Sequence, residues 1–434
     1  MTTLSLVDAA RRLSAGTLRV REYVEQLLER IGREDAGILA WAALDPARAR
    51  AIADSLDAAR AASTETRALF GIPIGVKDIV DTADLPTEMG CALFVGHRPA
   101  RDAAIVERLT GAGGFVLGKT VTTEVAFMHP GKTRNPWNPD HTPGGSSSGS
   151  AAAVAAGCVP GAIGTQTNGS VIRPAAYCGV VGFKPTFGLL PWRGVLQFSE
   201  TLDQLGTFAR SVDDVAWLTA PLADGEVLAQ HVALPGSAPR IGILERFPWS
   251  APDGESAAHL EQVAARLGRA GAVVDRIALP LEIHDANVVH RTIMLYEALQ
   301  QHGDLQASHR EALSAELNAA LDDARAIPRE AYANALAKRG AVMERVLSVF
   351  EHADVALTLS APAPAPRRLD ITGDPSFCTL WSLAGFPSIS IPSGLSRDGL
   401  PFGVQIAAPA GGDDRVLAVA KWCEAQLGFE GLVG

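Results

Sequence analysis

The chain has 434 residues, 47% of them hydrophobic, and a net charge of −10. This charge argues against a nucleic-acid or anionic-membrane surface, which would need clustered lysine and arginine. No run of about 18 uninterrupted apolar residues predicts a membrane span, and charged residues near the N-terminus interrupt any secretory pattern. Five widely spaced cysteines suit reduced thiols, so we expect a cytoplasmic protein.

Helix and strand patterns alternate from the N-terminus onward. Apolar residues at helical spacing predict a helix around 20–31, and Asp45 followed by Pro46 predicts the N-cap and first turn of a second helix. Further helices are expected at 103–109, capped by Asp102, at 256–270 and at 330–350. Short strands are expected at 115–117, 273–277, 355–359 and 388–391. This mixture favours an α/β protein layered around a sheet.

Two glycine- and serine-rich turns enclose a small-residue helical stretch between Gly144 and Arg173. Ser146 lies in the first turn and Ser170 in the second. Glycine permits tight turns and close approach of backbone N–H groups to a ligand, and a nucleophilic serine needs such donors at the charge it creates. Gly/Ser-rich segments are often linkers, but the apolar residues around both turns indicate buried structure. The layout is typical of a catalytic site.

A third residue completes the pattern. Lys77 ends a short apolar strand pattern within 71–81, where a lone lysine would otherwise be interpreted as a solvated surface group. With Lys77, Ser146 and Ser170 together, the chain resembles the amidase signature family, whose members use a Ser-Ser-Lys triad. The resemblance covers the N-terminal helical region and the segments 71–81, 102–119, 142–186 and 395–406.

The resemblance implies roles for these residues: Ser170 as nucleophile, Ser146 as bridging serine and Lys77 as base. A serine hydroxyl is a weak nucleophile until a base takes its proton, and lysine acts as a base only where its neutral form is favoured. Attack would give an acyl-enzyme, which water releases. The oxyanion would face the backbone N–H groups of Thr167, Asn168, Gly169 and Ser170.

The resemblance also implies a fold, a central mixed β-sheet flanked by α-helices on both sides. A single domain over 1–434 would hold core motifs at about 70–210, a variable helical region at about 218–353, and the C-terminal part of the sheet at about 354–434. The variable region matches the family least, so we expect substrate-facing variation there.

Two other motif matches point to different chemistry. Residues 113–120 satisfy the P-loop pattern G-x-x-x-x-G-K-[ST], but the strand expected at 115–117 lies inside the supposed loop. Residues 145–149 satisfy G-x-S-x-G, the nucleophile elbow, with Ser147 at its centre. That motif needs a preceding strand, which the polar run at 138–142 does not offer. We favour neither interpretation.

Metal chemistry finds no support in the sequence. The ten histidines contain no H-E-x-x-H pattern, and no C-x-x-C pattern occurs. We expect no metal site, and the chemistry implied by the resemblance requires no cofactor.

The second serine turn departs from the common family pattern. Gln166, Asn168 and Ile172 stand where many members have aspartate, glycine and arginine, and the arginine comes one residue later, as Arg173. A buried guanidinium without its acidic partner is costly, so another anion would meet Arg173. The segment is most similar to the malonamidase-like subgroup, where the corresponding arginine is associated with a substrate carboxylate. The alternative is that Arg173 only ties down the turn through carbonyl hydrogen bonds.

The expected activity is hydrolysis of the C–N bond of a small amide, with release of ammonia or an amine. Carbamate, urethane, aryl-acylamide or ureide hydrolysis by the same triad stays open. So do the amidase component of a tRNA-dependent amidotransferase and, third, a catalytically silent binding protein.

The resemblance places four residues near the site where they could bind an acyl or aryl group, although residues of these types are more often part of a core. They are Met128, Trp192, Phe377 and Trp381. The expected partner is a small-molecule amide, with no nucleic acid and no membrane, and self-association into a homodimer is left open.

Overall fold

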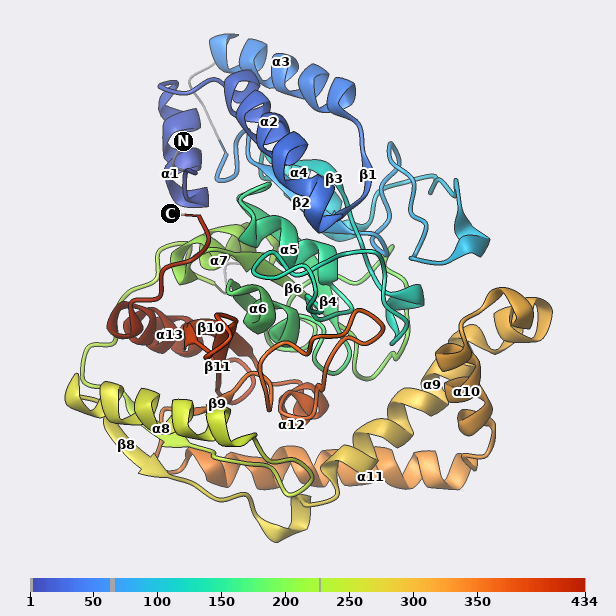
Figure 1. The fold of residues 1–434 in the computed structure, drawn as a ribbon, viewed down its shortest axis with the longest axis vertical. Helices are drawn as coiled ribbons and strands as arrows, with labels where there is room; N and C mark the ends of the chain where they lie inside the picture. Colours follow the sequence, from blue (N-terminus) through green and yellow to red (C-terminus); the bar gives the residue numbers. More distant parts are fainter. Residues whose placement is uncertain (1–2, 63–66, 226–227, 434) are drawn as a thin grey trace.

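The computed structural model describes residues 3–62, 67–225 and 228–433. An 11-stranded mixed sheet crosses the molecule in the order β1-β3-β2-β4-β6-β5-β10-β11-β9-β7-β8, with helices packed around it (Figure 1). The strands are β1 (Trp41–Leu44), β2 (Pro73–Lys77), β3 (Phe115–Thr120), β4 (Gly161–Gln166), β5 (Val181–Lys184), β6 (Gln204–Ala209), β7 (Arg240–Ile243), β8 (Val273–Arg276), β9 (Val355–Leu359), β10 (Ser388–Leu395) and β11 (Pro401–Ala407). The expected fold is therefore confirmed.

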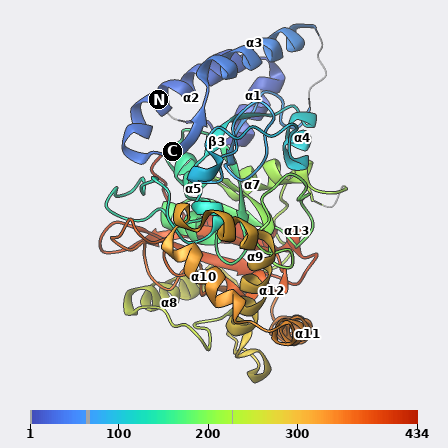
Figure 2. The same cartoon turned by 90° about the vertical axis from the view of Figure 1, so that its right-hand side faces the viewer.

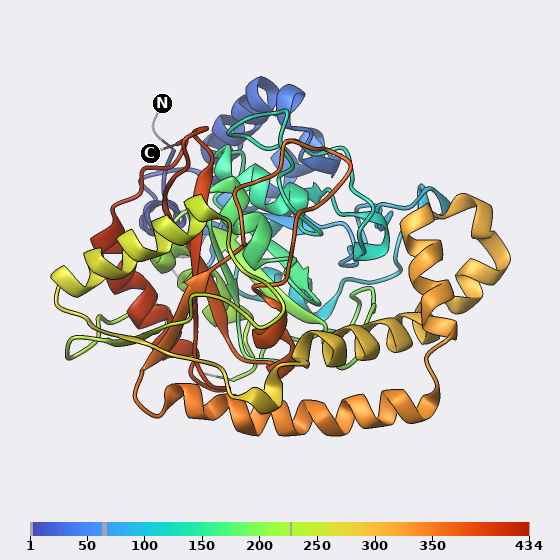
Figure 3. The same ribbon diagram turned by 60° about the horizontal axis from the view of Figure 1, so that its bottom comes forward.

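The helices form groups at the two ends of the sheet and over its faces. The α-helices are α1 (Leu6–Ala15), α2 (Val20–Ile38), α3 (Pro46–Ala62), α4 (Ala104–Gly111), α5 (Ser148–Ala155), α6 (Ile172–Cys178), α7 (Val212–Thr219), α8 (Gly254–Arg269), α9 (Ala286–His309), α10 (Ala315–Arg325), α11 (Arg329–Arg345), α12 (Thr379–Ala384) and α13 (Asp413–Leu427). Helices α1 to α3 cover one end (Figure 2), and α11 runs along the other (Figure 3). No helix in the described part of the chain has the length and apolar composition of a membrane span.

Both faces of the central strand β4 are covered. Residues three apart in a strand face opposite sides, and here each side meets a helix at close range. A Cβ on Gly161 would lie 3.0 Å from Leu218 of α7, and one on Gly164 would lie 2.6 Å from Ser147, just before α5. Glycine at these positions lets both layers approach the sheet.

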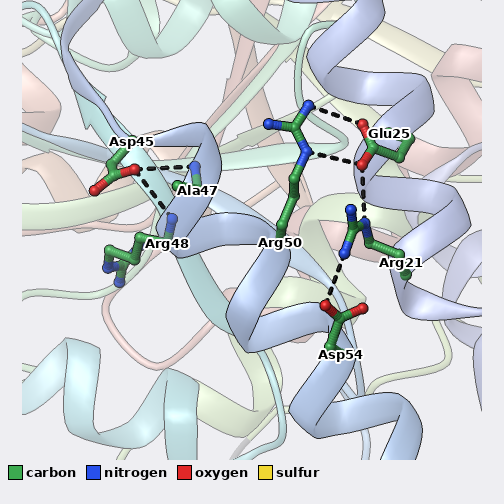
Figure 4. Close-up of polar contacts among 7 residues, drawn as sticks. All are labelled: Arg21, Glu25, Asp45, Ala47, Arg48, Arg50 and Asp54. Carbon is green, nitrogen blue, oxygen red and sulfur yellow. Dashed lines mark hydrogen bonds and ion pairs between the residues drawn. The ribbon is translucent and has the colours of Figure 1, made fainter.

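The second predicted helix begins as its sequence indicates. Asp45 Oδ1 accepts hydrogen bonds of 3.0 Å from the backbone N–H groups of Ala47 and Arg48, and Pro46 occupies the first turn of α3 (Figure 4). Glu25 of α2 accepts hydrogen bonds from the guanidinium of Arg50 in α3. This ion pair joins the two helices, although a half-exposed pair contributes only about 1 kcal/mol or less.

Some sequence-based boundaries were wrong. Asp102 does not cap α4, because its carboxylate accepts a hydrogen bond from the backbone N–H of Ala83 at 2.7 Å. The helix expected at 330–350 ends at Arg345 and continues as a 3₁₀ segment, Val346–Phe350. β7 was not predicted, and with β8 it extends the sheet into the region expected to be helical.

Two of the expected pocket aromatics lie in the core. Phe377 and Trp381 are completely buried. The Phe377 ring packs edge-on against Phe247 with centroids 5.1 Å apart, and the Trp381 ring lies 6.2 Å from that of Phe350. Trp381 follows Thr379 by two residues on α12, about 200° around the helix, so the two side chains face different surroundings.

Replacing Trp381 with alanine should therefore reduce stability. Deleting a fully buried tryptophan from a packed core costs about 3–5 kcal/mol of unfolding free energy. Denaturant unfolding would measure this, with Leu281→Ala as a control because Leu281 is 79% exposed and should change stability by less than about 0.5 kcal/mol. If Trp381→Ala unfolds as the parent does but changes the relative rates of acyl groups, the core assignment fails.

Candidate active site

Lys77 is the last residue of β2 and is completely buried. β2 is hydrogen-bonded to β3 on one side and β4 on the other, so its end lies inside the sheet. The Lys77 Nζ atom lies 2.7 Å from Ser146 Oγ and 2.7 Å from Thr165 Oγ1. No described carboxylate forms an ion pair with it. The amine is therefore held between two hydroxyl groups.

This environment favours the neutral amine. Burial lowers the pKa of Lys77 to about 7, while the negative charge of buried Asp203 acts in the opposite direction. An amine with a pKa close to neutral is populated in both protonation states at working pH, which is what a general base requires.

The loop that carries Ser146 packs directly against α6. The Gly145–Ser146 peptide bond is cis, and Gly144 has a φ of +80°. A Cβ at Gly144 would meet Pro174 Cα at 2.8 Å, so only glycine allows this close approach. Ser146 itself is buried with its hydroxyl against Lys77.

Two residues from the competing motif matches have structural roles. Ser147 Oγ donates to the Thr165 carbonyl and accepts from the Thr165 N–H, at 3.1 and 3.2 Å, so it is bound to the sheet. Lys119 of the P-loop pattern is completely buried in β3, 3.2 Å from Asp78 Oδ1. Its segment is a strand and offers no phosphate-binding loop.

Ser170 lies in the loop between β4 and α6, on the wall of a cavity of about 410 Å³. The backbone N–H groups of Thr167, Asn168, Gly169 and Ser170 donate no hydrogen bond to any described residue. By contrast, the next two N–H groups, of Val171 and Ile172, donate to Gln166 Oε1 at 2.7 and 3.0 Å. Four consecutive free donors thus border the cavity beside a serine.

The three residues of the expected triad are not all joined by hydrogen bonds. Lys77 and Ser146 are in contact, but no hydrogen bond links Ser146 to Ser170 among the described residues. Catalytic hydrogen bonds are often long before substrate binds.

Arg173 lies on the same cavity and is buried. It donates to the carbonyl oxygens of Gly145 and Gly373, at 2.7 and 2.9 Å, and to Thr372 Oγ1 at 3.1 Å. Its Nε has no partner, and no described carboxylate forms an ion pair with it. Burial lowers the pKa of Arg173. The arginine both braces the Ser146 loop and leaves part of its charge uncompensated.

The rest of the cavity wall combines apolar and polar groups. Phe127 and Phe198 stack with centroids 5.0 Å apart, and Met128, which is 55% exposed, lies beside them. Helix α9 contributes a face at helical spacing, Asn287, His290, Arg291 and Met294. Of the expected pocket residues, Arg173 and Met128 line this cavity. Trp192 lines a separate hollow of about 300 Å³ beside Leu190 and Gln197.

Sequence reasoning missed several residues of the site. Thr165, the second partner of Lys77, carried no motif signal beyond its place one residue before Gln166. Buried Asp203 accepts a hydrogen bond of 2.6 Å from Thr167 Oγ1, and burial raises the pKa of Asp203 to about 6. The cavity face of α9 repeats at i, i+3, i+4 and i+7, but three of its four residues are polar, so no apolar periodicity distinguishes this face in the sequence. No group of histidine, cysteine and acidic side chains in the described residues is arranged to hold a metal ion.

Comparison with known proteins gives a consistent result over the whole chain. A family model described as Amidase matches residues 22–417. The glutamyl-tRNA(Gln) amidotransferase A chain of Synechococcus sp. (strain CC9902) is 32% identical over 97% of this chain and 96% of its own length. Its counterpart in Shouchella clausii (strain KSM-K16) is 31% identical over 98% and 97%.

Solved structures agree. A protein described as an amidase superposes with a TM-score of 0.89 at 30% identity, covering 98% of this chain and all of its own. The peptide amidase of Stenotrophomonas maltophilia superposes with a TM-score of 0.82 at 30% identity, covering 98% of this chain and 96% of its own. A 6-aminohexanoate cyclic dimer hydrolase bound to its substrate gives 0.86 at 26%, with 98% and 97% covered. In sequence and in fold, this chain belongs to the amidase signature family, enzymes that hydrolyse C–N bonds.

Proposed function

We propose that this protein hydrolyses the C–N bond of a small amide through an acyl-enzyme on Ser170. The observation that carries the proposal is the buried amine of Lys77, held 2.7 Å from the Ser146 hydroxyl with no carboxylate pairing it in the described chain. A neutral amine in that position can take a proton from Ser146, which in turn takes one from Ser170.

In this mechanism Ser170 Oγ bonds to the amide carbon while its proton passes through Ser146 to Lys77. The negative oxygen of the tetrahedral intermediate is stabilised by the free N–H groups around Ser170, each contributing roughly 2.7–4 kcal/mol. The relay then returns the proton to the nitrogen as the C–N bond breaks, which releases ammonia or an amine. Water attacks the ester by the same route and frees the acid and Ser170.

The cavity also supports a preference for substrate charge. Arg173 lines it without an acidic partner among the described residues, and Gln166 is neutral where many family members have an aspartate. We infer that the acyl group carries a carboxylate that interacts with this guanidinium. The three hydrogen bonds of Arg173 to the protein support the alternative, in which it braces the loop and the substrate is a neutral amide or carbamate.

A second candidate function is that of the amidase component of a tRNA-dependent amidotransferase, because relatives of that name match nearly the whole chain at 32% identity. Such a protein would transfer ammonia within a complex. Obligate co-purification of other chains would favour it over a free amidase.

Ser170→Ala should abolish turnover and leave the fold unchanged, because the hydroxyl supplies chemistry and no packing. We expect a loss of about 10³-fold or more in kcat, measured as ammonia release, and hydroxylamine should trap an acyl-enzyme in the parent only. Ser148→Ala is the matched control, since that hydroxyl donates to the Val121 carbonyl and not to the cavity. A Ser170→Ala variant within tenfold of the parent would remove the triad assignment.

Activity should rise with pH as Lys77 loses its proton. Because burial lowers the pKa of Lys77 to about 7, kcat/KM should increase between pH 6 and 8 and then level off. The Lys77→Met variant should lose nearly all activity, and its kcat/KM should no longer rise between pH 6 and 8. Lys184→Met is the control: burial lowers the pKa of Lys184 to about 7 as well, but its amine contacts Gln204 and backbone carbonyls. A flat parent profile, with chemistry rate-limiting, contradicts the role of Lys77.

Arg173→Lys should separate the two substrate hypotheses. Lysine lacks the planar fork that binds a carboxylate through two hydrogen bonds, so KM for succinamate should rise by about tenfold or more, corresponding to about 1.5–3 kcal/mol. Butyramide, similar in size and neutral, is the internal control. Equal losses of kcat for both amides would assign Arg173 to bracing the loop.

A further inference from the structure

Helix α9 also contacts the loop that carries the free N–H groups, through His290. His290 of α9 is almost fully buried and lines the catalytic cavity. Its Nε2 lies 3.1 Å from the carbonyl oxygen of Thr167. A carbonyl oxygen only accepts, so Nε2 carries the hydrogen and donates it. Burial lowers the pKa of His290 to about 4, which keeps the ring neutral.

This hydrogen bond fixes the orientation of one peptide plane. In a trans peptide the C=O and N–H groups point in opposite directions. With the Thr167 carbonyl directed at His290, the N–H of Asn168 in the same plane must point away from α9. That N–H is one of the four unpaired donors on the cavity wall.

Helix α9 is itself anchored two turns further on. Buried Glu297 accepts hydrogen bonds from the Thr201 N–H at 2.9 Å and from the Tyr332 hydroxyl at 2.8 Å, and also from the hydroxyl of Ser199. Loop residues 199–201 lead directly to Asp203, whose carboxylate binds the Thr167 hydroxyl. Thr167 is thus bound twice. Its carbonyl accepts a hydrogen bond from His290 of α9, and its hydroxyl donates one to Asp203, which follows the loop that Glu297 of α9 binds.

We propose that His290 is a positioning residue that aligns the oxyanion donors by holding the Thr167 carbonyl. The inference rests on the proposed function, because it assigns the free N–H groups to the oxyanion. Since α9 presents Met294 and Asn287 to the same cavity, the helix that contacts the substrate also sets the geometry of the loop that stabilises the transition state.

The test uses the full-length protein and phenylmethylsulfonyl fluoride, which reacts with an activated serine and places a sulfonyl oxygen in the oxyanion site. His290→Gln retains an amide N–H near the position of Nε2, whereas His290→Leu and His290→Asn do not reach the Thr167 carbonyl with a donor. Displacing a catalytic group by about 1 Å costs about a hundredfold. We therefore expect the His290→Leu and His290→Asn variants to be sulfonylated at Ser170 about ten- to a hundredfold more slowly than the parent. The rate for His290→Gln should stay within about threefold of the parent rate.

Two further measurements separate positioning from folding. With the best amide substrate, the His290→Leu and His290→Asn variants should have a kcat lowered by the same factor as their sulfonylation rate, while KM changes little. His259→Leu is the control: His259, on α8, is partly buried, burial lowers its pKa to about 4 as it does for His290, and it binds Ser393 outside the cavity. It should leave both rates unchanged, and melting temperatures show whether each variant folds.

The outcomes are distinct. Parent-like sulfonylation of Ser170 in the Asn variant overturns the positioning role, and so does a Gln variant as slow as Leu. If the parent itself is not labelled at Ser170, the proposed function fails and the role of His290 fails with it.

Discussion

The structure depends on burying an amine at the centre of the sheet without giving it a counter-ion. Two other buried lysines, Lys119 and Lys184, have different partners for their amines. Lys119 has a counter-ion, Asp78 at 3.2 Å, although burial lowers the pKa of its amine. Lys184, whose pKa burial lowers to about 7, donates to carbonyl oxygens and to Gln204 Oε1, which only accept hydrogen bonds. Lys77 alone among the three meets only hydroxyl groups, of Ser146 and Thr165. Hydroxyls can donate as well as accept, so they stabilise either protonation state, and a proton can be exchanged with one of them.

A second constraint concerns the four backbone N–H groups from Thr167 to Ser170, which donate no hydrogen bond to any described residue. Buried backbone donors normally find partners, so four consecutive free ones require a loop that other contacts hold open. The side chain of Gln166 satisfies Val171 and Ile172 only, the Ser382 hydroxyl binds the Asn168 carbonyl, and His290 binds that of Thr167. Because these carbonyl oxygens are bound by side chains of α9 and α12, the two peptide planes that carry the N–H groups of Asn168 and Gly169 are fixed.

The sequence predicted the parts that local pattern or motif spacing determines. The strand at 355–359 coincides with β9, and Lys77 and Ser146 meet as the family resemblance implies. Properties that depend on three-dimensional packing were not predictable in the same way. Trp381 is an aromatic close in sequence to a cavity residue, yet the direction of its side chain depends on helical phase, and α12 turns it into the core. His290 lies in a segment with no motif, and its contact with Thr167 joins positions 123 residues apart.

The chemistry and the outer cavity wall come from different parts of the chain. Lys77 and the serine loops belong to the centre of the sheet, whereas Met294 and its neighbours on α9 belong to the helical segment between β8 and β9. If α9 only supplied contacts to the substrate, changes on it would alter KM and leave kcat unchanged. At His290, however, α9 also holds the Thr167 carbonyl, so a change at this position would alter kcat as well. Substrate range can therefore change through residues 287, 291 and 294, which face the cavity without holding the loop, at a smaller cost in turnover than through His290.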